Sequence, residues 1–260
     1  MNQRSTRSPR DQAEHLRRLH HDDAILVLVN VWDAASARVV AATPGCSAIA
    51  TASAAIAATH GYEDGENIPV DLMIDCLRRV CQAVELPVTA DLERGYTDVG
   101  ATTSAALNAG AVGINLEDDL CATETMEERI REAVDTGRAY GIPLVVNART
   151  DVFLRRPDAA PEQRDAEAAE RGGRYLDAGA DCVFVPGCTA EQHVRGLVGQ
   201  FGPGRLSLLA VPGTADVSTL QQWGVARLSH GPFPHRHTLH ALDAYAREHS
   251  ELSPTAPRQG

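Results

Sequence analysis

Short apolar runs alternate along the chain with segments in which apolar residues recur at helical spacing. The apolar runs have the length of strands and cover residues 24–32, 47–53, 86–93, 112–119, 142–150, 181–187, 205–213 and 225–231. The main helical segments lie at residues 34–43, 70–84, 99–110, 124–141, 161–179, 189–202, 216–224 and 234–249. Runs that are apolar almost throughout predict strands buried on both faces, as in a parallel sheet.

Eight strand–helix units predict a (β/α)8 barrel, a fold that usually takes about 250 residues. A doubly wound open sheet is the main alternative, but the chain has neither the G-x-G-x-x-G nor the Walker A motif that such a sheet would normally show. We expect one domain over residues 1–260, with an N-terminal arm and helix at 1–20, the barrel at 24–246 and a loose tail at 250–260. Residues 1–10 are also expected to be loose.

Composition and charge narrow the class of protein. Of the 260 residues, 43% are hydrophobic, which is enough for one large core. The net charge of −11 is unlike the basic field of a nucleic-acid-binding protein, so no nucleic-acid partner is expected. The longest apolar run, AILVLVNVW, is too short to cross a membrane, and the first twenty residues lack the apolar block of a secretory signal. Six cysteines without C-x-x-C spacing predict reduced thiols in a cytoplasmic protein with no membrane partner.

Acidic residues gather where consecutive predicted strands end. Asp91 and Glu93 end the run at 86–93, and Glu117 lies near the end of the next run. In a barrel, these strand ends meet at the face where catalytic residues lie. Carboxylates without a nearby lysine suit Mg²⁺ or Mn²⁺, which prefer oxygen ligands. The alternative is a buried hydrogen-bond network in which one carboxyl group is protonated.

Arg149 ends the following strand and is the candidate anchor for an anionic substrate. Its planar guanidinium group matches a carboxylate through two parallel hydrogen bonds. A plain ion pair with Glu117 or Asp151 is the alternative role. Asp119 and Asp151 could equally serve as caps of the helices that follow them.

Five motifs resemble the isocitrate lyase / phosphoenolpyruvate mutase superfamily in their order and spacing: NVWDAASARV, HGYEDGE, VTADLERGY, VGINLEDD and VVNARTDVF. The resemblance runs from about residue 28 to 240, and the short mutase-like and methylisocitrate-lyase-like members are the most similar. It implies a Mg²⁺-dependent barrel that makes or breaks C–C or P–C bonds in 2-oxo or 2-hydroxy acids. The reacting species would be enolate-like, with the metal and nearby dipoles stabilising it.

The resemblance also implies roles for the charged residues. Asp91 resembles the direct metal ligand. Glu93, Glu117 and Asp64 resemble the acids that hold the metal's water molecules. Arg149 resembles the substrate-binding arginine.

The turn formed by Thr51, Ala52, Ser53 and Ala54 resembles the stretch that grips the substrate carboxylate with backbone N–H groups and a serine. Members of the superfamily usually have Ser-Gly there, whereas this chain has Ala52 followed by Ser53. Ser53 would then supply its hydroxyl group from a neighbouring position.

Two residues are candidates for proton transfer. Lyases of the superfamily carry a Lys-Lys-Cys-Gly-His loop after the fourth strand and mutases a long gating loop, but here LEDDLCATETMEERI runs almost directly into a helix. Cys121 lies near the position of the lyase cysteine, and Tyr96 follows the acid pair, so either could act as acid or base. His230, at the end of the eighth strand, is interpreted as a loop histidine.

These observations predict a lyase that acts on the C–C bond of a small anionic 2-oxo or 2-hydroxy carboxylate with Mg²⁺, in which Arg149, Glu117, Cys121 and Tyr96 are the catalytic candidates. A phosphonopyruvate-type P–C mutase or hydrolase and a non-catalytic metabolite-binding barrel remain as alternatives. Superfamily members commonly form tetramers by exchanging their last helices, so a homo-oligomer, either a dimer or a tetramer, is expected through residues 234–249.

Overall fold

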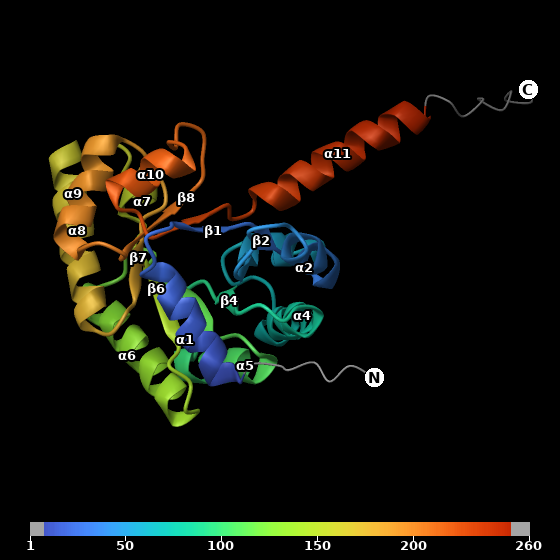
Figure 1. Ribbon diagram of the computed structural model, residues 1–260, viewed down its shortest axis with the longest axis horizontal. Helices are drawn as coiled ribbons and strands as arrows, with labels where there is room; N and C mark the ends of the chain where they lie inside the picture. Colours follow the sequence, from blue (N-terminus) through green and yellow to red (C-terminus); the bar gives the residue numbers. More distant parts are fainter. Residues whose placement is uncertain (1–7, 251–260) are drawn as a thin grey trace, which may run out of the picture.

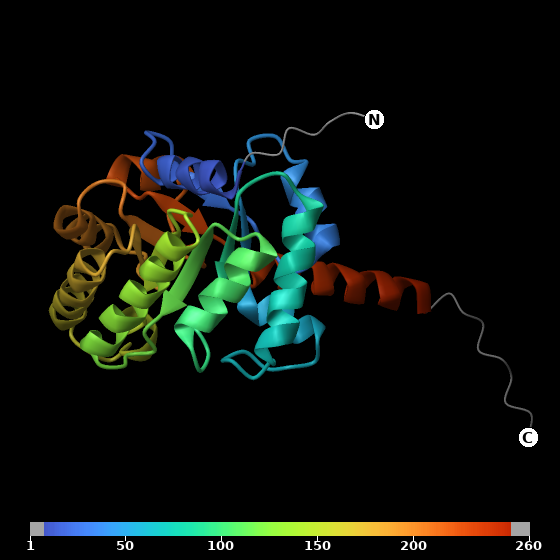
Figure 2. The same ribbon diagram turned by 90° about the horizontal axis from the view of Figure 1, so that it is seen from below.

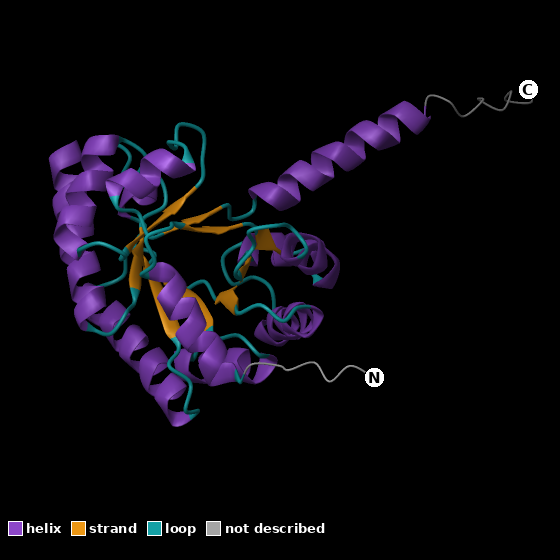
Figure 3. Cartoon of the chain, in the orientation of Figure 1, coloured by secondary structure: helices purple, strands orange, loops and turns teal. Residues whose placement is uncertain are grey.

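The computed structural model of the protein describes residues 8–250, and the expected loose ends at 1–7 and 251–260 lie outside the described residues. Within the described residues, nine parallel strands form one sheet in the order β1-β9-β8-β7-β6-β5-β4-β3-β2. Figure 3 shows the strands inside the surrounding helices. The strands are β1 (Leu26–Leu28), β2 (Asn30–Val31), β3 (Ile49–Thr51), β4 (Val88–Asp91), β5 (Gly113–Glu117), β6 (Val145–Arg149), β7 (Cys182–Phe184), β8 (Leu206–Leu209) and β9 (Arg227–Ser229).

The two outer strands of this order belong to one stretch of chain, and this stretch closes the barrel. β1 pairs with β9 and β2 pairs with β3, while only Val29 separates β1 from β2. The predicted strand at 24–32 is therefore interrupted once. The fold class, a (β/α)8 barrel with a parallel sheet, is confirmed.

Helices surround the sheet, and the apolar core lies mainly between the two layers (Figure 2). The helices are α1 (Pro9–His20), α2 (Ala34–Ala41), α3 (Ser53–Thr59), α4 (Val70–Ala83), α5 (Val99–Ala109), α6 (Thr123–Ala139), α7 (Val152–Arg155), α8 (Pro161–Asp177), α9 (Glu191–Phe201), α10 (Val217–Trp223) and α11 (Phe233–Ser250). The predicted helical segments match α2, α4, α5, α6, α8, α9, α10 and α11 to within a few residues at each end. Among residues 8–250, no helix is long and apolar enough to cross a membrane.

Helix α1 lies across the end of the barrel at which the strands begin (Figure 1). Ser8 caps its first turn in a reciprocal pair with Asp11, and Leu16 is fully buried. Gly113, the first residue of β5, makes room for this helix, because a Cβ atom there would lie 2.7 Å from Leu16 Cδ2. The expectation of loose chain up to residue 10 is therefore wrong from Pro9 onward, since the capped helix buries an apolar face.

Helix α11 departs from the pattern of the other units. It projects away from the barrel instead of packing back against it (Figure 1). Its first turn is anchored by His235, which is buried against Trp32 with the ring centroids 4.9 Å apart. Beyond that turn, Leu242 and Tyr245 are about 60% exposed. The expectation that the barrel extends to residue 246 is therefore wrong in its last helix. Val29, between β1 and β2, is 37% exposed.

Candidate active site

A cavity of about 170 Å³ lies at the end of the barrel where the strands finish. The last residues of five strands line it, namely Asp91, Arg149, Phe184, Leu209 and Ser229. The rest of its wall consists of Asn30, Ala52, Ser53, Ala54, Asp64, Asn115, Leu154, Pro186, Gly231, Pro232 and Arg236. This is the face at which enzymes of this fold carry their active sites.

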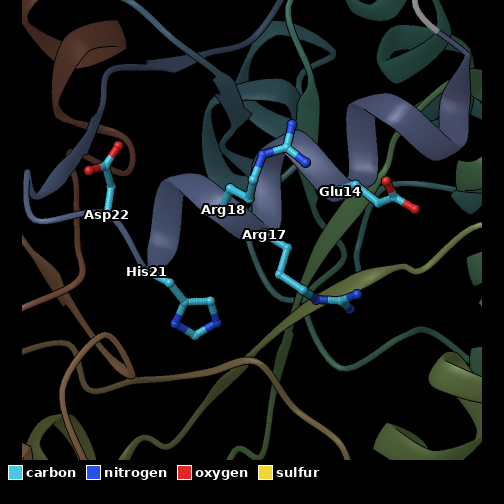
Figure 4. Close-up of a pocket in the computed structure, with 5 residues that line it drawn as sticks. All are labelled: Glu14, Arg17, Arg18, His21 and Asp22. Atoms are coloured by element: carbon cyan, nitrogen blue, oxygen red, sulfur yellow. The ribbon is translucent and has the colours of Figure 1, made fainter.

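A larger depression, of about 570 Å³, lies along the outer face of α1 and its C-terminal end (Figure 4). Glu14, Arg17, Arg18, His21 and Asp22 line it, and Arg17 is already paired with Asp181 at 2.6 Å. It belongs to the opposite end of the barrel, where α1 lies. The cavity at the strand ends is therefore the candidate active site.

Asp91 is held firmly at the edge of this cavity. Its Oδ2 atom accepts hydrogen bonds from the backbone N of Ser53 at 3.0 Å and from Ser53 Oγ at 2.8 Å. Its own backbone N donates to Thr51 Oγ1 at 2.9 Å. The Oδ1 atom accepts no hydrogen bond from the described residues, so one oxygen of a pre-oriented carboxylate faces the cavity.

The turn expected to bind the substrate carboxylate forms hydrogen bonds mainly with Asp91 instead. Ala52, Ser53 and Ala54 line the cavity, whereas Thr51 does not. The N–H group of Ala52 donates to the carbonyl oxygen of Val31 at 3.2 Å, and that of Ser53 donates to Asp91. Of the backbone donors in this turn, that of Ala54 alone has no acceptor among the described residues. Thr51 and Ser53 are therefore placed to orient Asp91. In this turn, the backbone N–H group of Ala54 remains available to donate to an anion.

Glu93 is buried beyond the end of β4 and is held by the loop after α3. Its Oε2 atom accepts a short hydrogen bond from the backbone N of Glu66, and Oε1 is buried without a partner among the described residues. Both residues have positive φ angles, 53° for Glu93 and 62° for Glu66, a strained conformation that often marks functional loops. Burial and the carboxylates of Asp91 and Asp64 raise the pKa of Glu93 to about 7.

Arg149 forms ion pairs on both sides, as the alternative interpretation of the sequence allowed. Its Nη1 atom lies 2.6 Å from Glu117 Oε2, and its Nε atom lies 2.7 Å from Asp151 Oδ1. The Nη2 atom has no partner among the described residues, and the side chain lines the cavity. The two carboxylates thus fix the guanidinium plane and leave one edge for a ligand. Burial raises the pKa of Glu117 to about 8, although Arg149 acts in the opposite direction.

A belt of alternating charges ties the loops on this side of the mouth together. Glu66 pairs with Arg94 at 3.0 Å, Arg94 with Asp119 at 3.3 Å, and Asp119 with Arg155 at 2.7 Å. These residues come from the loop after α3, the loops after β4 and β5, and α7. We call them the charge belt. Sequence reasoning did not identify it, because its members are spaced irregularly along the chain.

The structure agrees with the predicted metal site only in part. Among residues 8–250, no three His, Cys, Asp or Glu side chains converge closely enough to hold an ion together. The expected convergence of three carboxylates is therefore not confirmed. Asp91 and Asp64 line the cavity, and burial and the charge of Asp91 raise the pKa of Asp64. The ionised forms of Asp64 and Asp91 destabilise each other, and a hydrated divalent cation such as Mg²⁺ or Mn²⁺ would offset that repulsion.

The two predicted proton donors lie outside the cavity wall. Cys121 is half-buried with its Sγ atom 3.9 Å from Arg129 Nη1, and burial raises the pKa of its thiol. The hydroxyl oxygen of Tyr96 is buried without a hydrogen-bond partner among the described residues. Burial, followed by the charge of Glu93, raises the pKa of Tyr96. Neither residue has the lowered pKa or the position expected of a group that acts on a ligand in this conformation.

Sequence reasoning gave no role to Asn115, Arg236 or Asp118. Asn115 and Arg236 line the cavity, and Asp118 is buried directly beyond the strand that ends in Glu117. Asp118 accepts hydrogen bonds from Tyr175 at 2.7 Å and from the backbone N of Asp151 at 3.0 Å, which shows a structural role. Asn115 could have been found, because it lies two residues before Glu117 in an apolar run and so faces the same way.

Comparison with known families finds a match over most of the chain. The profile of the phosphoenolpyruvate phosphomutase family matches residues 16–250. The uncharacterized protein Rv1998c of Mycobacterium tuberculosis H37Rv is 31% identical over 90% of this chain and 88% of its own length. A 2-methylisocitrate lyase of Halalkalibacterium halodurans is 26% identical over 73% of this chain and 64% of its own length.

Solved structures show the same similarity. The structure of a proposed phosphonomutase from Burkholderia cenocepacia J2315 aligns with a TM-score of 0.87 and 36% identity, covering 93% of this chain and 99% of the other. A structure of 2,3-dimethylmalate lyase aligns with a TM-score of 0.81 and 25% identity, covering 95% of this chain and 90% of the other.

Proposed function

The chain belongs to the phosphoenolpyruvate phosphomutase family, and we propose that it is a metal-dependent lyase acting on the C–C bond of a small 2-oxo or 2-hydroxy carboxylic acid. The family and its superfamily contain both lyases and mutases, so membership supports an enzyme of one of these two kinds. The choice between them rests on the shape and chemistry of the cavity.

One observation carries this proposal: the cavity has two unlike walls. Asp64, Asp91 and Arg149 form a charged wall at the ends of β4 and β6 and in the loop after α3. Phe184 and Leu209, at the ends of β7 and β8, form an apolar wall together with Leu154 of α7 and the turn residues Pro186 and Pro232. A substrate that matches both walls has a carboxylate at one end and an alkyl group at the other, as an alkyl-substituted malate or isocitrate has.

The protein groups suit cleavage of such an acid. In the reaction, the hydroxyl group loses a proton, the adjacent C–C bond breaks, and its electron pair moves to the carbon beside a carboxylate, which then takes up a proton. Arg149 would hold a substrate carboxylate with its free edge, while Glu117 and Asp151 keep the guanidinium plane in place. When bound, the divalent ion would stabilise negative charge on the oxygen of the enolate-like species.

A P–C mutase or hydrolase is the second candidate, because the cavity also contains Arg236. Two guanidinium groups, those of Arg149 and Arg236, could share a phosphonate dianion. The proposed phosphonomutase noted above also has the higher sequence identity to this chain. The apolar wall is the argument against it, since a phosphonate offers that wall no apolar group.

The test is turnover of an acid panel by the purified protein with Mg²⁺, with Mn²⁺ and with a chelator. The panel contains isocitrate, 2-methylisocitrate, alkyl-substituted malates and phosphonopyruvate. A carbonyl reagent detects released 2-oxo acids, and ³¹P NMR detects P–C bond change. We expect 2-oxo acid release from an alkyl-substituted acid, and we expect the chelator to remove it.

Each other outcome selects an alternative. A ³¹P change with phosphonopyruvate, without C–C cleavage, would establish the second candidate. Tight metal-dependent binding of an acid that is never turned over would indicate a metabolite-binding barrel. The Asp91→Ala variant, purified in parallel, excludes a contaminating enzyme as the source of activity.

We also propose that the protein is a homo-oligomer, a dimer or a tetramer, assembled through α11. Leu239, Leu242 and Tyr245 follow one another at spacings of three residues and are 48–61% exposed. Burying such a stripe is the usual source of stability for a projecting helix. Sedimentation equilibrium should give a mass that is a multiple of the chain mass, and Leu242→Glu should reduce it. A monomeric wild-type protein at micromolar concentration would refute this assignment.

A further inference from the structure

The floor of the cavity contains a polar group to which the proposed chemistry gives no role. Asn115, on β5, lines the cavity and is only 7% exposed. It lies two residues before Glu117 on the same strand, so both side chains face the inside of the barrel. Asn147 lies beside it in register on β6. These residues form part of a polar interior rather than the branched apolar layers usual in such barrels.

The orientation of the Asn115 side-chain amide is fixed from below. Its Oδ1 atom lies 3.2 Å from Arg227 Nη2 and 3.0 Å from Asn147 Nδ2. A guanidinium group can only donate hydrogen bonds, so the Asn115 atom that faces it must be the oxygen. The amide cannot be flipped without placing an N–H group against an N–H group. The Nδ2 group of Asn115 is therefore directed away from Arg227.

That Nδ2 group has no hydrogen-bond acceptor among residues 8–250. Buried amide donors in native proteins are nearly always paired with protein, water or ligand. Because Asn115 lines the cavity, the open position for an acceptor lies inside the cavity. The acceptor would be an oxygen atom of whatever molecule occupies it.

Arg227 makes this donor stronger than an ordinary amide. Its side chain is fully buried, and no carboxylate lies within ion-pair distance of it among the described residues. Burial lowers its pKa to about 10, so it still carries its charge near neutral pH. A cation that donates to Oδ1 draws electron density from the amide and strengthens the N–H groups on its far side. An anionic acceptor gains most from such a donor.

We propose that Asn115 binds an anionic oxygen of the substrate at the cavity floor, with Arg227 and Asn147 as positioning residues that hold its amide. This inference rests on the proposed function, because it assumes a small carboxylate as the occupant. It adds a neutral but polarised donor on the strand next to that of Arg149. It also gives a reason for a buried, unpaired arginine inside the barrel.

The experiment measures binding, so it does not depend on turnover. The probe is oxalate, a planar dianion that has a carboxylate next to an anionic oxygen, as the enolate of a 2-oxo acid has. Calorimetric titration with oxalate in Mg²⁺ is compared for the wild-type chain, Asn115→Leu, Arg227→Met and Arg227→Lys. Thr89→Val is the matched control, since Thr89 is 2% exposed, lies on neighbouring β4 and does not line the cavity.

We expect Asn115→Leu to weaken oxalate binding at least about tenfold, and Thr89→Val to leave it unchanged. Arg227→Met should weaken binding severalfold while keeping or raising the melting temperature, because replacing a buried charge with an apolar side chain is often neutral or stabilising. Arg227→Lys, which keeps a donor and a charge, should recover part of the affinity. Opposite changes in binding and stability separate a positioning role from a merely structural one.

The outcomes distinguish a failure of this inference from a failure of the proposed function on which it rests. If the wild-type chain binds no oxalate with Mg²⁺, both the proposed function and this inference are overturned. If the wild type binds oxalate and folded Asn115→Leu binds it equally well, the inference alone is overturned. Should Asn115→Leu not fold, Arg227→Met decides the matter, because unchanged affinity in that variant also overturns the inference.

Discussion

The two walls of the cavity differ in how they are held as well as in chemistry. On the β4–β6 side, Asp91 is fixed by Ser53, Arg149 is fixed by Glu117 and Asp151, and the charge belt joins the loops outside them. On the β7–β9 side, the wall consists mainly of apolar side chains and turns, to which Ser229 and Arg236 add polar groups. Among the described residues, no ion pair joins the loops 185–190, 210–216 and 230–232.

This difference suggests a division of labour between the walls. Charged groups must be placed accurately to stabilise a developing charge, and several hydrogen bonds to each group restrict its motion. An apolar wall discriminates by volume alone, so it needs less fixation and tolerates change. We therefore expect the charged wall to determine whether the reaction occurs and the apolar wall to determine which acid reacts.

The largest effect should come from removing the carboxylate at the centre of the charged wall. Asp91→Ala deletes the candidate metal ligand and should reduce kcat/KM at least about 10³-fold, roughly 4 kcal/mol of transition-state stabilisation. Glu128→Ala, which removes an exposed carboxylate from α6, is the matched control and should have no effect. Steady-state kinetics and a thermal melt check both. An Asp91→Ala variant with more than a tenth of wild-type activity would contradict the assignment.

Arg149→Lys should have the next largest effect. Lysine keeps the charge but cannot reach Glu117, Asp151 and a substrate carboxylate from one rigid plane. We expect a loss on the order of 10²-fold in kcat/KM, about 2.7 kcal/mol. Arg155→Lys is the control, because Arg155 belongs to the charge belt but does not line the cavity. Equal kinetics for the two variants would reduce Arg149 to a structural ion pair.

A smaller effect should appear in the pH dependence of stability. The pKa of Glu93 rises from about 4.5 to about 7 on folding, so the native state retains a proton that the unfolded chain has lost. In chelator, the contribution of Glu93 to stability should therefore fall as pH rises from about 4.5 to about 7 and then level off, by on the order of 2 kcal/mol. Mg²⁺ favours the ionised acids and should reduce this loss. Melting curves of the wild type and of Glu93→Gln, recorded across this pH range, measure the loss of stability. If stability changes equally with pH in both proteins, Glu93 is not its source.

The smallest effect should be a change of preference at the apolar wall. Leu209→Ala enlarges the cavity and should shift the ratio of kcat/KM between ethyl- and methyl-substituted acids about tenfold toward the larger one, or about 1.4 kcal/mol. The kcat/KM for whichever of the two acids the variant prefers should differ little from the highest value of the wild type. Leu72→Ala, on the exposed face of α4, is the control. If Leu209→Ala abolishes all activity, the apolar wall does more than select the substrate.

The sequence was sufficient for the barrel but for only part of the site. Periodicity located all the strands, because burial on both faces leaves a clear apolar run. It missed the exposure of α11, since an apolar stripe looks the same whether its own barrel covers it or not. The charged residues at predicted strand ends pointed to Asp91, Glu93, Glu117 and Arg149 as candidate site residues. Of these, Asp91 and Arg149 line the cavity.

The remaining features depend on tertiary contacts that no local pattern records. That Ser53 binds Asp91, rather than facing a substrate, follows from the close approach of the first residue of α3 to the last residue of β4. The orientation of Asn115 depends on Arg227, which is 112 residues away along the chain. Cys121 was identified from its position after the fourth predicted strand, and only the folded loop shows that it lies outside the cavity wall.

Helix α11 has a consequence for how the protein would respond to dilution. Its first turn places Arg236 in the cavity wall, while its later turns are largely exposed on the side occupied by Leu242 and Tyr245. In the oligomer that we propose, a second copy of the chain would cover these outer turns. By mass action, anything that covers or uncovers those outer turns will change the population in which Arg236 is in place. Specific activity would then depend on the concentration of the protein itself, through a surface of α11 that lies far from the reacting bond.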